Sequence, residues 1–213
     1  MRRRDEWIAA LVRELQPVRP ALAPSSFAIV WLAGSWLLTV AVIAAGGPMR
    51  PGWFAQLSEH PRLQLEFLLG LGAGAVAILG VGQLSIPSPR HIPARAAPAL
   101  VVFTAWTATY LWGLWDPAVP PSMAGKRAHC WVEIFVWAAP LAITGLWLAR
   151  RGAPLARTWT GALLGAAAAS IPAVWMQVAC MYDAAHILVY HLAPIGGVAI
   201  LGAVMGPLVL QRI

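Results

Sequence analysis

Long apolar stretches, separated by short segments rich in proline, glycine and charged residues, dominate the sequence. Each has close to the ~20 residues that a helix needs to cross a ~30 Å hydrocarbon core. The stretches that we read as membrane spans are residues 27–45, 67–86, 96–115, 130–149, 158–179 and 184–210. The pattern therefore predicts an all-α membrane protein, built as a bundle of six transmembrane helices.

The segment before the first span has a different pattern. Apolar residues recur there at the spacing of one face of an α-helix, and prolines follow them. This stripe consists of Trp7, Ile8, Leu11, Val12 and Leu15. We expect residues 1–24 to be a cytoplasmic segment with a short amphipathic helix, and residues 25–213 to be the transmembrane domain. The stripe suits an anchor on the inner leaflet or a docking helix for a cytoplasmic protein, and its spacing fits both.

Composition strengthens the membrane interpretation. Hydrophobic residues make up 60% of the chain and charged residues only 11%, against about 25% charged in average soluble domains. The mean hydropathy is +0.70. Basic residues outnumber acidic ones, 15 to 8, but the longest basic run is Arg2–Arg4, so we do not expect direct nucleic-acid binding. We expect the first apolar stretch to be retained as a span, because no cleavage site of small residues follows it.

The basic residues also predict an orientation. If the N-terminus is inside, only Arg50, Arg62, Lys126 and Arg127 face outward, and every other basic residue faces the cytoplasm. The positive-inside rule then places both termini in the cytoplasm of a bacterial inner membrane. Tryptophans near several predicted span ends agree with this arrangement.

Both cysteines of the chain fall at the same predicted membrane face. Cys130 opens the fourth span and Cys180 closes the fifth, so both are expected near the outer surface. Such a pair can form a disulfide, bind a soft metal or switch between thiol and disulfide, but buried cysteines are also ordinary small hydrophobes.

Imidazole and carboxylate groups flank the two cysteines. The candidate ligands for a transient heavy-metal ion are Cys130 and Cys180, together with His129, Glu133, His186 and His191. Thiolate and imidazole are ligands of zinc and of softer ions, although no spacing here matches a paired CxxC signature. Histidines at helix ends are also often merely hydrogen-bonded.

Two motifs and the overall layout resemble one known family. They are "AHCWVEIFVWAAPLAITGLWLARRGAPL" and "QVACMYDAAHILVYHLAPI", preceded by the helix "WIAALVRELQPVRP". The chain resembles the NrsF family of transmembrane anti-sigma factors, negative regulators of ECF sigma factors. The resemblance implies that Cys130 and Cys180 match the family's paired periplasmic cysteines, which sense stress. It also implies that the N-terminal segment holds an ECF-type sigma factor, freed on exposure to heavy metals or oxidants.

The sequence thus predicts a membrane-embedded regulator of transcription in a stress response, and not an enzyme. The alternative is a membrane thiol/quinone oxidoreductase that uses the outer cysteine pair; such enzymes normally need a second redox pair, and the chain has only two cysteines. A small transporter is a weaker alternative, because the centres of the predicted spans carry no charge.

Overall fold

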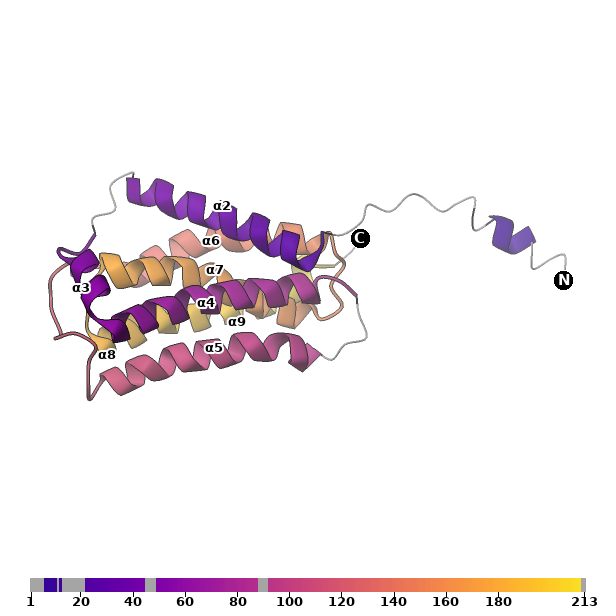
Figure 1. The fold of residues 1–213 in the computed structure, drawn as a ribbon. Helices are drawn as coiled ribbons and strands as arrows, with labels where there is room; N and C mark the ends of the chain where they lie inside the picture. The colour runs from indigo at the N-terminus through magenta and orange to yellow at the C-terminus, as the bar shows by residue number, and fades with distance from the viewer. Residues whose placement is uncertain (1–5, 11, 13–21, 45–48, 88–91, 212–213) are drawn as a thin grey trace.

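The computed structural model describes residues 6–10, 12, 22–44, 49–87 and 92–211. Long helices lie side by side in a single bundle (Figure 1). Among the described residues there is no strand, only an isolated bridge between Ser122 and Tyr182. The predicted all-α class is confirmed.

The helices follow the predicted order. The long ones are α2 (Pro24–Ala44), α4 (Pro61–Leu84), α5 (Ile92–Gly113), α6 (Cys130–Arg150) and α7 (Arg157–Ala179). The last one is continuous but has three parts: α8 (Ala184–Ile187), the π-helical turn η1 (Leu188–Leu192) and α9 (Ala193–Val209). A short helix that we did not predict, α3 (Trp53–Glu59), precedes α4.

The described helices include five that are long and apolar enough to span a membrane, one fewer than predicted. The helix that falls short is α5, although it has 22 residues and packs along α4 in the same bundle. Its threonines, Trp106 and Tyr110 lower its hydropathy, and Trp106 and Tyr110 are fully buried inside the bundle. The structure therefore supports a helical membrane protein with five candidate spans.

Helix α7 forms the centre of the bundle. It contacts α2, α4, α5, α6 and α9, and nearly every residue from Thr160 to Ala179 is buried. Small residues allow this close approach: a Cβ on Gly161 would overlap the backbone of Gly202, and one on Gly165 would overlap the backbone of Val198. In membranes, where lipid is as apolar as leucine, such close contact is a main source of helix association.

The N-terminal end of α4 differs from the prediction. The helix begins at Pro61, six residues before the predicted span, and proline at the first turn is favoured because its missing N–H needs no partner. As a result Glu66, which directly precedes the predicted span, lies within the helix and is completely buried. Apolar periodicity missed this turn because it contains Arg62 and Glu66.

Parts of the predicted N-terminal helix are described. Residues 6–10 and residue 12 are helical, and Trp7, Ile8 and Val12 are exposed. Leu11 and Leu15 lie outside the described residues.

Candidate thiol and imidazole centre

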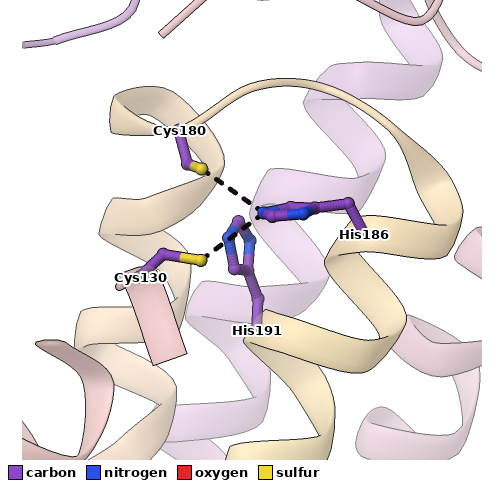
Figure 2. A group of neighbouring side chains, drawn as sticks. All are labelled: Cys130, Cys180, His186 and His191. Carbon is purple, nitrogen blue, oxygen red and sulfur yellow. Dashed lines mark hydrogen bonds between the residues drawn. The ribbon is translucent and has the colours of Figure 1, made fainter. Parts of the chain in front are cut away.

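Two cysteines and two histidines meet at one end of the bundle. The potential ligand atoms of Cys130, Cys180, His186 and His191 all lie within 4.8 Å of one another. Nε2 of His186 is 3.5 Å from each of the two sulfur atoms (Figure 2). Segments separated by 50 residues in the sequence therefore supply one compact set of donors.

Helix ends place three of the four residues. Cys130 is the first residue of α6, and Cys180 is the residue at which α7 ends in an extended conformation. The chain then turns into α8, whose start is capped by Asp183: its carboxylate accepts a 2.7 Å hydrogen bond from the backbone N–H of His186. Such a cap is a common way to fix a helix start, and here it sets the position of His186.

The π-helical turn η1 brings the second histidine to the same side. Residues five apart in an α-helix point about 140° apart, since each residue turns the chain by about 100°. The i→i+5 hydrogen bonds of a π-helix instead place such residues almost one above the other. The rings of His186 and His191 are accordingly 5.2 Å apart and nearly perpendicular. Pro194 follows directly, and its missing N–H removes a regular α-helical bond at this point.

The centre is buried and incompletely hydrogen-bonded. Cys130, Cys180 and His191 are almost completely buried, whereas His186 is half-buried. Neither ring nitrogen of His191 has a hydrogen-bond partner at standard distances and angles, although the Cys180 thiol is close enough to interact with the ring. A buried polar group without a partner costs free energy, and native structures contain few of them. A ligand bound among these four residues would remove that cost.

The two thiols are electrostatically unequal. A hydrogen bond from the Cys130 thiol lowers the pKa of the Cys180 thiol more than burial raises it, and His191 lowers that pKa further. Cys180 is therefore the more acidic thiol of the pair. Thiolates, and not thiols, are the nucleophiles and metal ligands of proteins.

The donor set fits a tetrahedral soft cation. Metal–ligand distances of ~2.0–2.3 Å in a tetrahedral site separate the ligand atoms by about 3.3–3.8 Å. The two sulfur–nitrogen distances of 3.5 Å already lie in this range. The limit of 4.8 Å on the other separations means that closure needs movements of about 1 Å or less. Two sulfur and two nitrogen ligands match zinc and softer ions.

Two other predicted ligands lie outside this cluster. Glu133 forms a bidentate ion pair with Arg127, at 2.8 and 2.9 Å. His129 is exposed and directly precedes α6, and its side chain makes no capping hydrogen bond to the N-terminus of that helix. The structure therefore brings four of the six predicted ligands together, and it brings neither His129 nor Glu133 to them.

The residues that hold the cysteine-bearing loop in place could not be recognised from the sequence. Arg50 is buried, and its guanidinium donates a 3.0 Å hydrogen bond to the carbonyl oxygen of Cys180. The backbone N–H of Arg50 also donates to the carbonyl of Val178. A basic residue in a predicted loop is expected to have a solvated side chain. Only the contacts of Arg50 with the distant Val178 and Cys180 show that it anchors this loop.

A second anchor joins this loop to α4. The hydroxyl of Tyr182 donates to the buried carboxylate of Glu66, at 3.2–3.3 Å, and accepts a 3.1 Å hydrogen bond from the N–H of Ala118. Burial, followed by the nearby Glu66, raises the pKa of Tyr182, so the hydroxyl stays a neutral donor. Arg62 lies 3.7 Å from the same carboxylate.

The fold and the site together define a helical membrane protein with a buried two-cysteine, two-histidine centre at one end of its bundle. The family model of NrsF, negative regulator of sigma F, matches residues 11–211, nearly the whole chain. The chain belongs to this family, as the resemblance indicated, and is a negative regulator of a sigma factor. No curated protein matched the chain, and no solved structure did.

Proposed function

We propose that the chain is an inner-membrane anti-sigma factor that holds an ECF-type sigma factor in the cytoplasm through residues 1–24. Binding of a heavy-metal ion at Cys130, Cys180, His186 and His191, or oxidation of the two cysteines, releases the sigma factor. The observation that carries the proposal is the meeting of these four side chains at one end of the bundle. Helix α2, which follows the N-terminal segment, begins at the opposite end (Figure 1).

The orientation rests on charge. Helix α5 begins, α6 ends and α7 begins at the end of the bundle where α2 begins (Figure 1). Arg95 is in the first turn of α5, Arg150 ends α6 and Arg157 begins α7, as expected for a cytoplasmic face. The cysteine centre is then on the periplasmic side, where metals and oxidants arrive first. Both termini are cytoplasmic in this arrangement.

The exposed apolar stripe of the N-terminal segment supports docking. Trp7 is 70% exposed and Val12 58% exposed, so neither is buried against the bundle. An amphipathic helix with its apolar face uncovered needs a groove or a lipid surface to cover it. We propose that Trp7, Ile8, Leu11, Val12 and Leu15 enter a groove of the sigma factor in the unstimulated cell.

In this proposal, metal binding starts the signal by moving the helix ends that carry the four ligands. An ion that draws its ligands to tetrahedral distances pulls α8 and η1 toward the start of α6 and the end of α7. Because α7 and α9 are in backbone contact at Gly161 and Gly202, a displacement of one helix is transmitted to the other. Oxidation acts on the same ends: with hydrogen peroxide as oxidant, two thiols and one peroxide give one disulfide and two molecules of water.

A reporter of sigma-dependent transcription tests the proposal in cells. Deletion of residues 1–20 should give high transcription without any inducer, because the sigma factor is no longer held. Cys130→Ser and Cys180→Ser should keep basal transcription low and abolish induction by Cd²⁺. Low basal transcription after the deletion would show that the segment does not hold the sigma factor.

The oxidoreductase alternative uses the same cysteines but has a separate test. Quinone reduction by the purified chain with a dithiol donor would support it. Reporter induction that requires both cysteines, without quinone reduction, supports the anti-sigma factor.

A further inference from the structure

An open groove lies between α2 and α6, away from the cysteine centre. It has a volume of about 340 Å³. Its lining residues come from both helices: Val30, Trp31, Gly34, Ser35, Leu38, Pro140, Leu141, Thr144, Trp147 and Leu148. The groove is a slot that runs along α2 and α6, two of the described helices that are long and apolar enough to cross a membrane.

The groove offers apolar surface, and the donor groups of its polar side chains are already engaged. The indole N–H of Trp31 donates to the carbonyl of Leu141, at 3.0 Å, and the hydroxyl of Ser35 donates to the carbonyl of Trp31. The hydroxyl of Thr144 donates to the carbonyl of Pro140. A polar ligand would therefore find no free side-chain donor in the slot, whereas a hydrocarbon chain needs none.

A cation stands at one end of the groove. The guanidinium of Arg151 lies 3.7 Å from the ring centroid of Trp147, which lines the groove. Among the described residues Arg151 makes no ion pair. The rise from Pro140 to Arg151 is about 16 Å at 1.5 Å per residue, close to half of a ~30 Å hydrocarbon core. The groove thus spans the depth of one leaflet, with a positive charge at the interface.

The lining and the charge of the groove favour a lipid as its occupant. The lining runs over about 12 Å of each helix, from Val30 to Leu38 and from Pro140 to Leu148. This apolar length suits part of one hydrocarbon chain, and the guanidinium of Arg151 at its end suits an anionic headgroup.

We propose that this groove binds an anionic phospholipid, with one acyl chain between α2 and α6 and the headgroup phosphate on Arg151. Phospholipid of this kind surrounds any bacterial membrane protein, and a guanidinium can hold a phosphate through two parallel hydrogen bonds. The site is independent of the cysteine centre and of sigma-factor binding.

Gly34 gives a clean way to block the groove. A Cβ added there would meet no atom within 4 Å, and Gly34 lines the groove, so a leucine side chain at this position starts in the open space of the slot. Gly196, in α9, is equally open and lies outside the groove. Gly196→Leu is therefore the matched control for Gly34→Leu. It makes the same substitution within a helix, with the same change in helix propensity, but outside the groove.

The test is native mass spectrometry of the full chain purified in detergent, titrated with phosphatidylglycerol or with phosphatidylethanolamine of the same chains. We expect the unchanged chain to bind one phosphatidylglycerol more tightly than phosphatidylethanolamine. Gly34→Leu should weaken that binding about tenfold or more, and Gly196→Leu should leave it unchanged. Arg151→Gln should abolish the preference for phosphatidylglycerol and keep acyl-chain binding.

Several results would overturn the proposal. Equal lipid binding by Gly34→Leu and the unchanged chain would show that the groove does not hold the lipid. An equal loss of binding in Gly34→Leu and Gly196→Leu would show that the loss is not specific to the groove. A dimer of the unchanged chain that Gly34→Leu dissociates would show that a second copy occupies the groove. Arg151→Gln is a separate variant, so its result does not depend on whether Gly34→Leu folds. Arg151 lies after the last residue of α6, where a change of side chain leaves the helix intact. A retained preference for phosphatidylglycerol in Arg151→Gln would rule out the headgroup contact by itself.

Discussion

Sγ of Cys130 lies 3.5 Å from Nε2 of His186, although 56 residues separate them in the sequence. The same nitrogen is equally close to Sγ of Cys180, so one imidazole touches both thiols. This relationship makes the centre a single chemical unit, and it yields direct predictions.

The purified chain should bind one Cd²⁺ per molecule, with a thiolate-to-metal charge-transfer band in its absorption spectrum. Cys130→Ser or Cys180→Ser should remove the band, because each removes a sulfur ligand. His191→Ala should weaken binding at least about tenfold, since a ligand is worth 1.4 kcal/mol or more. His129→Ala is the matched control and should bind as the unchanged chain does. Equal affinity in the two histidine variants would contradict the four-residue centre.

The alkylation of Cys180 should depend weakly on pH. An ordinary thiol, protonated below its pKa, becomes about tenfold more reactive for each pH unit as its thiolate fraction rises. Because the pKa of Cys180 is lowered, its thiolate is already formed near neutrality, so the rate between pH 6 and pH 8 should rise much less. Peptide mass spectrometry after iodoacetamide pulses would measure the rate at this residue.

The control for this prediction removes the cause of the shift. Cys130→Ala takes away the hydrogen bond that lowers the pKa of Cys180 most. The rate at Cys180 should then rise more steeply with pH. A steep profile in the unchanged chain as well would show that Cys180 is an ordinary thiol.

Tyr182→Phe should destabilise the fold by about 1–3 kcal/mol, since it leaves the buried carboxylate of Glu66 without its hydroxyl donor. Thermal unfolding in detergent, followed by circular dichroism, would measure the change. Tyr190→Phe removes a hydroxyl from an exposed tyrosine and should change stability little. If the two variants melt alike, the Tyr182–Glu66 contact contributes no stability.

Gly161→Ala should weaken the packing of α7 on α9. The new Cβ would overlap the carbonyl oxygen of Gly202, which belongs to a helix backbone and cannot rotate away. We expect a loss of about 1–3 kcal/mol in thermal unfolding, typical of overpacking. Gly196→Ala, with open space around it, should be neutral or slightly stabilising. An unchanged melting temperature for Gly161→Ala would show that the two helices are not in tight contact.

The sequence predicted much of this molecule, because the pattern of apolar stretches is strong in a membrane protein. It placed Cys130 at the start of one helix and Cys180 at the end of the next, and the structure has them there. It predicted six spans where five of the described helices qualify, because the threonines, Trp106 and Tyr110 make α5 less apolar than its length suggests.

The centre itself was only partly predictable. Helical spacing grouped His129 and Glu133 with Cys130, but Glu133 is paired with Arg127 instead. The grouping of His186 with His191 depends on the π-helical turn, which no apolar period reveals. Arg50 and Glu66 were missed as buried residues because their partners come from distant segments, the carbonyl of Cys180 and the hydroxyl of Tyr182.

The central position of α7 also bears on how the protein assembles. This helix is the least apolar of the five candidate spans and is almost wholly covered by its neighbours, so lipid is a poor substitute for them. It becomes fully covered only when the surrounding helices have closed around it. Because Cys130 begins α6 and Cys180 ends α7, the packing of these two consecutive helices brings the two thiols to the same end of the bundle. The two imidazoles reach them only when α8 and η1 have packed there as well, so the four side chains lie together only in the assembled bundle.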